Sequence, residues 1–401
     1  MCKKQWILAL IAALMVIAAG CGGDEKTVTD TEAVPASEES LTENGMPVVD
    51  REGVLLGTID ARAACSAVDA GLFYSVFEFG ENAFTADAEY HLFSKDDHSD
   101  VLLGTFDGQG YEAAYTRTEL NGRIYTLAVR GKAGEDDIPL VLLSFDPARK
   151  TMETFTISET GFPYTDMAAA DGKLLIMNHE MSGRHTDTVY EFDPSDGSVR
   201  DLLTFSADTD SLRGICAAEN GFYLLRLKIG SGSENEMFVD RYDEEGRKVS
   251  ELSVNEIMAQ AIMTVHGIQG RADALNEIGM NIAHFSVLDD RYMLYENFGL
   301  SRICVDLETG KTLFAGDDLY AVSTGNGSPV VYRMGFDGEH PENPDITGFE
   351  DGTSVRFPFT PTDSHRLVRT VSRSEAGTWA VVTSDSPRAF EWTQMVRLWT
   401  E

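Results

Sequence analysis

The densest group of residues able to do chemistry lies between positions 178 and 187. It reads Asn178-His179-Glu180-Met181-Ser182-Gly183-Arg184-His185-Thr186-Asp187. Imidazole nitrogens and carboxylate oxygens can bind zinc, and the candidate ligands here are His179, Glu180, His185 and Asp187. The metalloprotease spacing His-Glu-x-x-His is absent, and a loop lacks the rigid helix that would direct two histidines at one ion. A solvated loop is therefore the alternative interpretation.

The elements around this group follow from turn signals that recur along the chain. Asn121-Gly122, Asp171-Gly172 and Asn220-Gly221 each precede a run of β-prone residues, and related turns recur at intervals of roughly 50 residues. A second turn, such as the one at 192–197, follows most of the first ones. Two hairpin turns in each repeat predict about four strands in each repeat. We therefore predict an all-β fold, a seven-bladed β-propeller of four-stranded blades over residues 49–401.

The two ends of the propeller are predicted to pair. Val54-Leu55-Leu56-Gly57-Thr58-Ile59-Asp60 is nearly repeated at 101–107, where the outermost strand of a blade is expected. The last repeat supplies only three strands. We therefore expect residues 53–59 to add the fourth strand of the last blade, which removes an exposed sheet edge.

One insertion, at 253–280, interrupts the repeats. Ser253 and Glu256 form a capping box that predicts the start of a short amphipathic helix. This helix either packs on the propeller itself or presents a docking surface. The side chains of the second interpretation are Met258, Met263 and Met280.

A candidate binding face depends on the predicted blades. The segments that lead into the innermost strands would surround one mouth of the central channel. Arginine and tyrosine there offer directional donors and aromatic faces for recognition, although each could instead cap its own strand. The residues of this candidate face are Arg62, Tyr111, Tyr164, Arg213, Tyr320 and His365.

The N-terminal segment predicts export. Residues 1–20 combine a short basic start with an apolar run too short for a bilayer, which needs about 20 apolar residues. Ile17-Ala18-Ala19-Gly20-Cys21 resembles the lipobox of bacterial lipoproteins, which implies lipidation of Cys21. A plain signal peptide is the alternative. Residues 21–48 are rich in Thr, Ser, Glu and Ala, and predict a disordered acidic tether.

One repeat carries a family resemblance. Val305-Asp306-Leu307-Glu308-Thr309-Gly310-Lys311 resembles the Asp-x-x-Thr-Gly-Lys repeat of PQQ-like β-propellers, and 192–202 is a looser copy. The tryptophan that ends that repeat is missing here, so no quinone cofactor is implied. The lipoprotein members of that family, which scaffold envelope assembly, are the nearer comparison.

Charge and motifs together limit the function. The net charge of −34 argues against nucleic-acid binding. No nucleophile motif or acid–base pair is readable, so no catalytic residue and no cofactor are assigned. We expect a monomer, lipid-anchored to the cell membrane on its extracytoplasmic face, that binds or scaffolds a protein or polysaccharide. Two alternatives stay open: a polysaccharide lyase or glycoside hydrolase with carboxylates at the channel mouth, and a small-ligand sensor domain.

Overall fold

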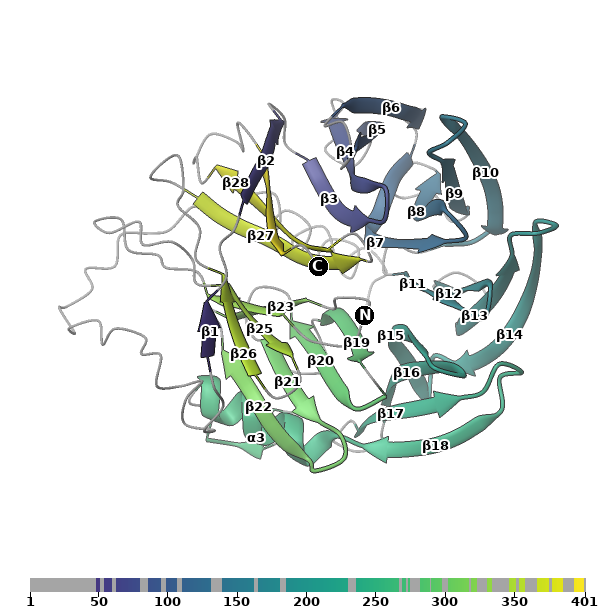
Figure 1. Ribbon diagram of the computed structural model, residues 1–401. Coiled ribbons are helices and arrows are strands. Elements are labelled where there is room, and N and C mark those ends of the chain that lie inside the picture. Colours follow the sequence, from purple (N-terminus) through teal and green to yellow (C-terminus); the bar gives the residue numbers. More distant parts are fainter. Residues whose placement is uncertain are drawn as a thin grey trace.

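The structure is a computed structural model. Its strands form sheets that are arranged around a common centre (Figure 1). It describes residues 48–50, 54–59, 63–79, 86–94, 99–106, 110–130, 139–161, 165–180, 185–229, 236–266, 269–271, 273–274, 282–288, 290–297, 302–316, 319–322, 330–333, 346–350, 353–357, 366–374, 377–384 and 393–399. Within these residues there are seven sheets, six of four strands and one of five. The predicted segments at 1–20 and 21–47 lie outside the described residues.

Five sheets consist of four consecutive antiparallel strands. In chain order they are β3 (Ala63–Val68), β4 (Gly71–Phe79), β5 (Ala86–Ser94), β6 (Asp100–Phe106); β7 (Gly110–Leu120), β8 (Arg123–Arg130), β9 (Leu140–Asp146), β10 (Thr151–Ser158); β11 (Asp166–Ala170), β12 (Lys173–Glu180), β13 (Thr186–Asp193), β14 (Ser198–Ser206); β15 (Asp210–Ala218), β16 (Gly221–Lys228), β17 (Glu236–Tyr242), β18 (Lys248–Ser253); and β19 (Ile282–Leu288), β20 (Tyr292–Asn297), β21 (Arg302–Asp306), β22 (Lys311–Gly316).

The other two sheets include strands from the start of the chain. One is formed by β27 (Arg366–Ser374), β28 (Gly377–Ser384), β29 (Thr393–Trp399) and β2 (Val54–Ile59), with β2 antiparallel to β29. The other is formed by β23 (Leu319–Val322), β24 (Val330–Arg333), β25 (Ile346–Glu350), β26 (Thr353–Phe357) and β1 (Val48–Asp50). The expectation of four strands in every blade is wrong for this sheet. Strand β1 pairs in parallel with β26 and covers the edge that this outer strand would otherwise expose.

The innermost strand of each sheet faces the centre (Figure 1). Strands β3, β7, β11, β15 and β19 contact one another in that order, and β27 contacts both β23 and β3. The contact between β27 and β3 brings the last sheet of the chain against the first. Because the innermost strands run the same way around the ring, all of them start at one end of the central channel.

The two ends of the ring differ in how the strands are joined. We call the end that carries the two hairpin turns of each sheet the turn end, and the opposite end the loop end. At the turn end, Asn121 and Gly122 have φ values of 53° and 71°, and Asp171 and Gly172 have 48° and 73°. Tight hairpin turns of this twist need positive φ at both central residues, which explains the Asn-Gly and Asp-Gly repeats.

The Asp-x-x-Thr-Gly repeat is also explained by a turn. Asp306 Oδ1 accepts hydrogen bonds from the backbone of Glu308 at 3.0 Å and Thr309 at 3.4 Å. Gly310 closes the turn with φ of 67° and donates to the Asp306 carbonyl at 2.8 Å. Hydrogen bonds from the Arg291 guanidinium lower the pKa of Asp306 to about 2. These residues hold a hairpin together, so the repeat has a structural role here.

The core lies between neighbouring sheets, so both faces of a sheet are buried. One cluster joins the sheet β7–β10 to the sheet β11–β14, including Leu127, Leu142 and Ile176. Another joins β11–β14 to β15–β18, including Met177 and Leu224. Outer strands differ, because every residue of β18 is exposed. Long apolar runs at inner strands and polar residues at outer strands follow from this arrangement.

The helical insertion is α3 (Asn255–His266). It starts one residue later than the capping box predicts, because Ser253 still pairs with Phe238 in the sheet. Asn255 Oδ1 instead accepts a hydrogen bond from the backbone of Met237 at 2.5 Å, and this fixes the helix to β17. Acidic Glu256 lies in the first turn, where the helix dipole favours it.

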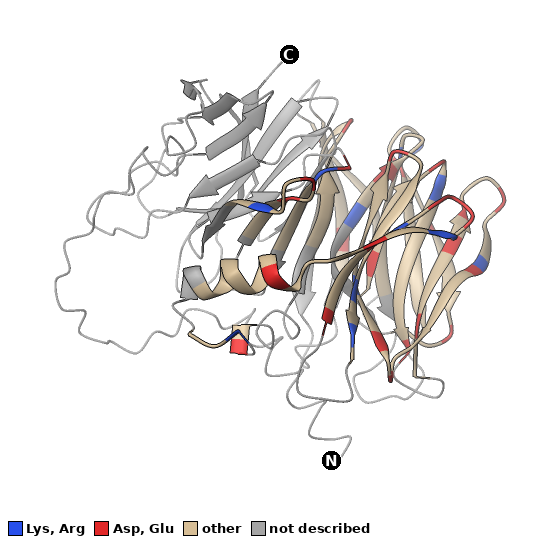
Figure 2. Ribbon diagram, turned by 90° about the horizontal axis from the view of Figure 1, so that it is seen from below, with Lys and Arg blue, Asp and Glu red and all other residues tan. Residues whose placement is uncertain are grey.

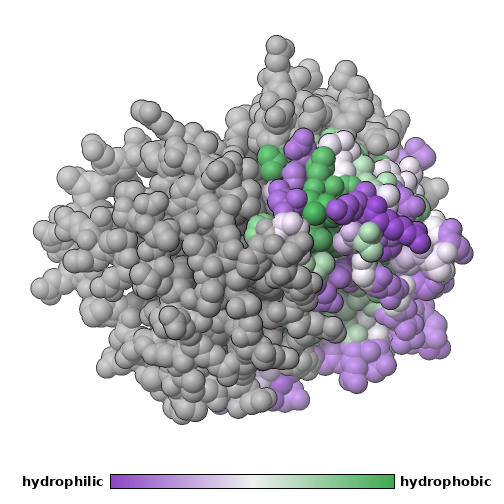
Figure 3. Space-filling view, turned by 45° about the horizontal axis from the view of Figure 1, so that its top comes forward, coloured by the Kyte–Doolittle hydropathy of each residue, from purple (hydrophilic) through white to green (hydrophobic). Residues whose placement is uncertain are grey.

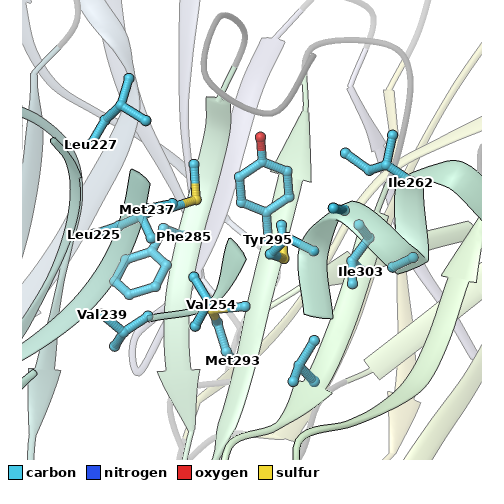
Figure 4. Close-up of a cluster of buried hydrophobic side chains, with 14 of the residues drawn as sticks. Leu225, Leu227, Met237, Val239, Val254, Ile262, Phe285, Met293, Tyr295 and Ile303 are labelled. Carbon is cyan, nitrogen blue, oxygen red and sulfur yellow. The ribbon is translucent and has the colours of Figure 1, made fainter. Parts of the chain in front are cut away.

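The apolar face of α3 is buried against the propeller. Val254 and Ile262 pack with Phe285 and Tyr295 in a cluster that joins two sheets (Figure 4). Met258 is 0% exposed and Met263 is partly buried in the same cluster, while Met280 lies outside the described residues. The docking interpretation is therefore wrong for Met258, and the helix fills the wedge between the two sheets.

Charged residues are distributed over the described part of the chain. Aspartate and glutamate occur on turns and strands throughout, with lysine and arginine among them (Figure 2). Figure 3 shows a small apolar area surrounded by hydrophilic side chains. The most exposed large apolar side chains are Leu102, Ile229, Val249 and Leu252. Among the described residues no helix has the length and apolar character needed to cross a membrane.

Candidate functional site

The candidate binding face maps to the loop end of the ring. Tyr111 lies in β7 beside its first residue, and Tyr320 occupies the same place in β23. Their backbones are therefore at the loop end, while their side chains are outside what the structure describes. Arg62, Tyr164 and His365 lie outside the described residues, and the strands β3, β11 and β27 begin one or two residues after them.

Arg213 is the member of this set whose side chain is described. In β15, Leu212 pairs with Arg226 and Gly214 pairs with Leu225, so Arg213 is the extra residue of a β-bulge. Comparable register shifts occur near the starts of β7, β19 and β27. Bulges re-aim side chains and are over-represented beside functional sites. Among the described innermost strands, four therefore carry an irregularity at the loop end.

The predicted metal ligands do not converge on one point. His179 pairs with Asp187 across β12 and β13, whereas the next pair is Glu180 with Thr186. Because side chains alternate along a strand, Glu180 points to the opposite face of the sheet. His185 is exposed, with φ of 48°. In the described part of the chain, no group of three His, Cys, Asp or Glu side chains could hold a metal ion.

The face that carries His179 meets the sheet β15–β18, and we call this contact the His179 seam. His179 Nδ1 and Asp187 Oδ1 lie 2.9 Å apart, and Asp187 is 3% exposed. The other carboxylate oxygen, Oδ2, accepts a hydrogen bond from the backbone N–H of Leu212 at 2.6 Å. Asp187 therefore orients the imidazole and also fixes the strand that carries Arg213.

The opposite face meets the sheet β7–β10, and we call this contact the Asn178 seam. Glu180 Oε1 accepts from the Tyr190 hydroxyl at 3.1 Å and Oε2 from the Thr186 hydroxyl at 3.3 Å. Burial, opposed by a hydrogen bond to Ser158 and reinforced by Glu180, raises the pKa of Tyr190, so the phenol stays a donor. Asn178 is 0% exposed and its Nδ2 donates to the Thr160 carbonyl at 2.9 Å.

Two further loop-end carboxylates also have structural partners. Asp166 Oδ2 accepts from the backbone of Ile215 at 3.1 Å, across the His179 seam. Asp210 Oδ1 accepts from Arg226 at 2.5 Å, and the same guanidinium donates to Asp240 at 2.6 Å. The Arg226 side chain is 8% exposed, so these hydrogen bonds compensate for the burial of its charge. Carboxylates of both seams thus hold strands in place.

No protein-family model matches the chain, and no curated protein matches it in sequence. The chain is similar to a chain of the mitotic checkpoint complex, at 8% identity over 86% of this chain and 96% of that chain, with a TM-score of 0.50. The sheets around one centre are those of a β-propeller.

Two further solved structures are similar to this chain with lower TM-scores. The WD40 β-propeller domain of Doa1 is 13% identical over 87% of this chain and 98% of that chain, with a TM-score of 0.45. Oligogalacturonate lyase from Vibrio parahaemolyticus is 12% identical over 86% of this chain and 98% of that chain, with a TM-score of 0.46. Identities this low concern the fold alone.

The 178–187 segment contains more strand residues than the sequence predicts. The sequence predicts a loop here, whereas β12 runs to Glu180 and β13 begins at Thr186. Strand alternation through Glu180 would have placed His179 and Glu180 on opposite faces. The contact between Asp187 and the Leu212 backbone has no signal in the sequence, because it depends on how two sheets pack.

Proposed function

We propose that this protein is a membrane-anchored, extracytoplasmic seven-bladed β-propeller that binds a protein or polymer partner without catalysis. Cys21 carries the lipid, residues 21–47 form the tether up to Val48 of β1, and the folded part is a monomer. The lipobox-like sequence before Cys21 supports the anchor. The resemblance of 305–311 to PQQ-like repeats supports the comparison with propeller lipoproteins that scaffold envelope assembly.

The observation that carries the binding role is the irregular loop end. Four innermost strands among those described have register shifts near their starts, and one of these shifts presents Arg213. At the turn end, the hairpins at 121–122 and 171–172 are tight, and the register shifts described there lie between outer strands, as between β17 and β18. Loops on one face of a rigid scaffold are the usual place for recognition in repeat folds.

The direction of the chain supports the same face. Strand β1 runs parallel to β26, which starts at the turn end, so Val48 lies toward the turn end. The proposed tether therefore joins the propeller away from the loop end. A partner approaching the loop end does not have to displace the anchored side.

Four loop-end carboxylates are engaged within the protein, which makes these four poorly suited to glycoside cleavage. Glycosidases use two carboxylates about 5 to 9 Å apart, one of which must reach the sugar. Four of the carboxylates described at this end accept hydrogen bonds from backbone or side-chain donors of the protein. They are Asp166, Glu180, Asp187 and Asp210.

Cross-linking in intact cells tests the binding role. Cells expressing the full chain are cross-linked, and linked peptides are mapped by mass spectrometry. We expect repeated links from one partner to the loop end, and their loss in Arg213→Ala. The matched control is Arg247→Ala, an exposed arginine at the turn end, which should leave the links unchanged. No reproducible partner, or links confined to the turn end, would overturn the proposal.

A separate measurement tests the anchor. The native chain should take up labelled palmitate and fractionate with membranes. Cys21→Ser should abolish both, whereas Cys304→Ser, which changes a buried thiol, should abolish neither. Membrane fractionation of Cys21→Ser at the native level would overturn the anchor while leaving the binding role open to the cross-linking result.

A further inference from the structure

At the loop end of the Asn178 seam, several side-chain oxygen atoms lie on one face of the sheet β11–β14. Asn178 and Glu180 are two residues apart in β12 and therefore share a face. Asp166, the first residue of β11, pairs with Met177, and this register continued by one residue places the preceding Thr165 opposite Asn178. Below them the seam is apolar, with Met167 and Ile176 in its core.

Two of these oxygens have unused hydrogen-bonding capacity. Asn178 Oδ1 and Thr165 Oγ1 are buried and have no hydrogen-bond partner within the described part of the chain. Their residues are 0% and 6% exposed. Buried polar atoms in native proteins are nearly always bonded, so such a pair points to a ligand group. Only the amide nitrogen of Asn178 is occupied, by the Thr160 carbonyl.

The chemistry of the set selects its ligand. Asn178 Oδ1 can only accept, Thr165 Oγ1 can accept, and the Glu180 carboxylate carries a negative charge with lone pairs beyond the two it uses. A primary ammonium has three N–H donors for three separate oxygens, whereas the planar guanidinium prefers a free, bidentate carboxylate. We propose that this set binds the ammonium group of a lysine side chain presented by the partner protein.

The depth of the set suits a lysine. Glu180 is partly exposed at the rim, while Asn178 is fully buried one step inward. The four-carbon stem of lysine can pack along apolar surface while its ammonium reaches polar atoms at the end. The net charge of −34 adds long-range attraction for a basic partner. This inference rests on the proposed binding role and specifies the chemistry of the partner.

A titration that needs no partner tests the site. The full-length chain, purified in detergent, is titrated with Nα-acetyl-L-lysine methylamide by ligand-detected NMR. We expect saturable binding with a dissociation constant of roughly millimolar size, and at least about tenfold weaker binding in Asn178→Leu. The isosteric Thr165→Val should weaken binding about fivefold without loss of the fold, while Thr165→Ser, which keeps the hydroxyl, should bind as the native chain does.

Matched ligands and variants guard against unspecific attraction to an acidic protein. The norleucine analogue, which lacks the ammonium, should not bind, and the arginine analogue should bind more weakly. Glu180→Gln should weaken binding, whereas Glu244→Gln, which removes the same charge from an exposed position at the turn end, should not. Equal binding of the norleucine or arginine analogue, displacement of lysine by millimolar calcium, or equal effects of the two glutamate variants would overturn the site. Failure of this titration overturns the ammonium site alone, whereas absence of loop-end cross-links overturns the binding role.

Discussion

The two faces of the sheet β11–β14 differ in how their buried polar side chains are hydrogen-bonded. Each face buries polar side chains near the loop end, against a neighbouring sheet. On the His179 seam, Asp187 bonds both an imidazole and the backbone of the next sheet. On the Asn178 seam, Glu180 bonds hydroxyl groups, while Asn178 and Thr165 keep buried oxygens without partners among the described residues.

This difference distinguishes buried polar groups that hold strands in place from buried polar groups that are available to a ligand. A buried carboxylate with two good partners fixes the positions of two strands, and its removal leaves charged or polar groups uncompensated. A buried oxygen without a protein partner contributes nothing to that fixation and lowers stability. Residues of the first kind should be costly to replace. Thr165 should be cheap to replace in stability but important for binding, whereas replacing Asn178 also loses its hydrogen bond to the Thr160 carbonyl.

The largest effect is expected on the His179 seam. Asp187→Asn replaces an acceptor oxygen facing the Leu212 N–H and removes the charge beside His179. We expect a loss of about 2 to 4 kcal/mol in the free energy of unfolding, measured by urea denaturation. Asp208→Asn, at an exposed position in a nearby loop, should change stability by no more than about 0.5 kcal/mol. Equal, small effects of the two variants would show that Asp187 does not join the sheets.

A steric change probes how closely the segment after β10 packs on the neighbouring strand β9. A Cβ added at Gly161 would lie 2.8 Å from Leu140 Cβ and 3.0 Å from its backbone nitrogen. Neither atom can move without shifting β9, so Gly161→Ala should cost about 1 to 3 kcal/mol in thermal or urea unfolding.

The control for this change is Gly270→Ala. The atom that its Cβ would meet first is Asp273 Oδ2, at 2.6 Å, which is the end of a flexible side chain. We expect this variant to lose far less stability than Gly161→Ala. If both glycines tolerate alanine equally, the segment after β10 is not in close contact with β9 at Gly161.

A smaller effect, with a pH signature, is expected at Tyr190. Tyr190→Phe removes the donor to Glu180 and should cost about 1 kcal/mol at neutral pH. Because the folded pKa of Tyr190 is raised, its contribution is complete below the unfolded pKa of about 10 and is lost as pH rises through the folded pKa. The difference between native and variant should therefore shrink as the pH rises above about 10 in urea denaturation. A difference that grows with pH would contradict the buried, protonated phenol.

The sequence predicts some of this comparison and not the rest. Asp171-Gly172 predicts the hairpin between β11 and β12 because only certain residues adopt positive φ, a local requirement that the chain displays directly. The opposite orientations of the His179 and Glu180 side chains follow once the end of β12 is known. The turn signals in the sequence do not mark that end. The bonds of Asp187 to Leu212 join residues on different sheets, and no local pattern specifies which sheets meet or at what height.

The smallest expected change in the free energy of unfolding is that of Thr165→Val, and its sign is opposite to that of the other variants. Thr165→Val removes a buried hydroxyl that has no partner among the described residues, and keeps the side-chain volume. Its removal should leave the free energy of unfolding unchanged or raise it by up to about 1 kcal/mol, because no protein hydrogen bond is lost and a desolvated polar group disappears. Thr165→Ser retains the hydroxyl and should gain nothing. A loss above about 1 kcal/mol in Thr165→Val would mean that the hydroxyl fixes strands as Asp187 does. The two seams would then be alike, and the oxygen set would have no capacity left for an ammonium group.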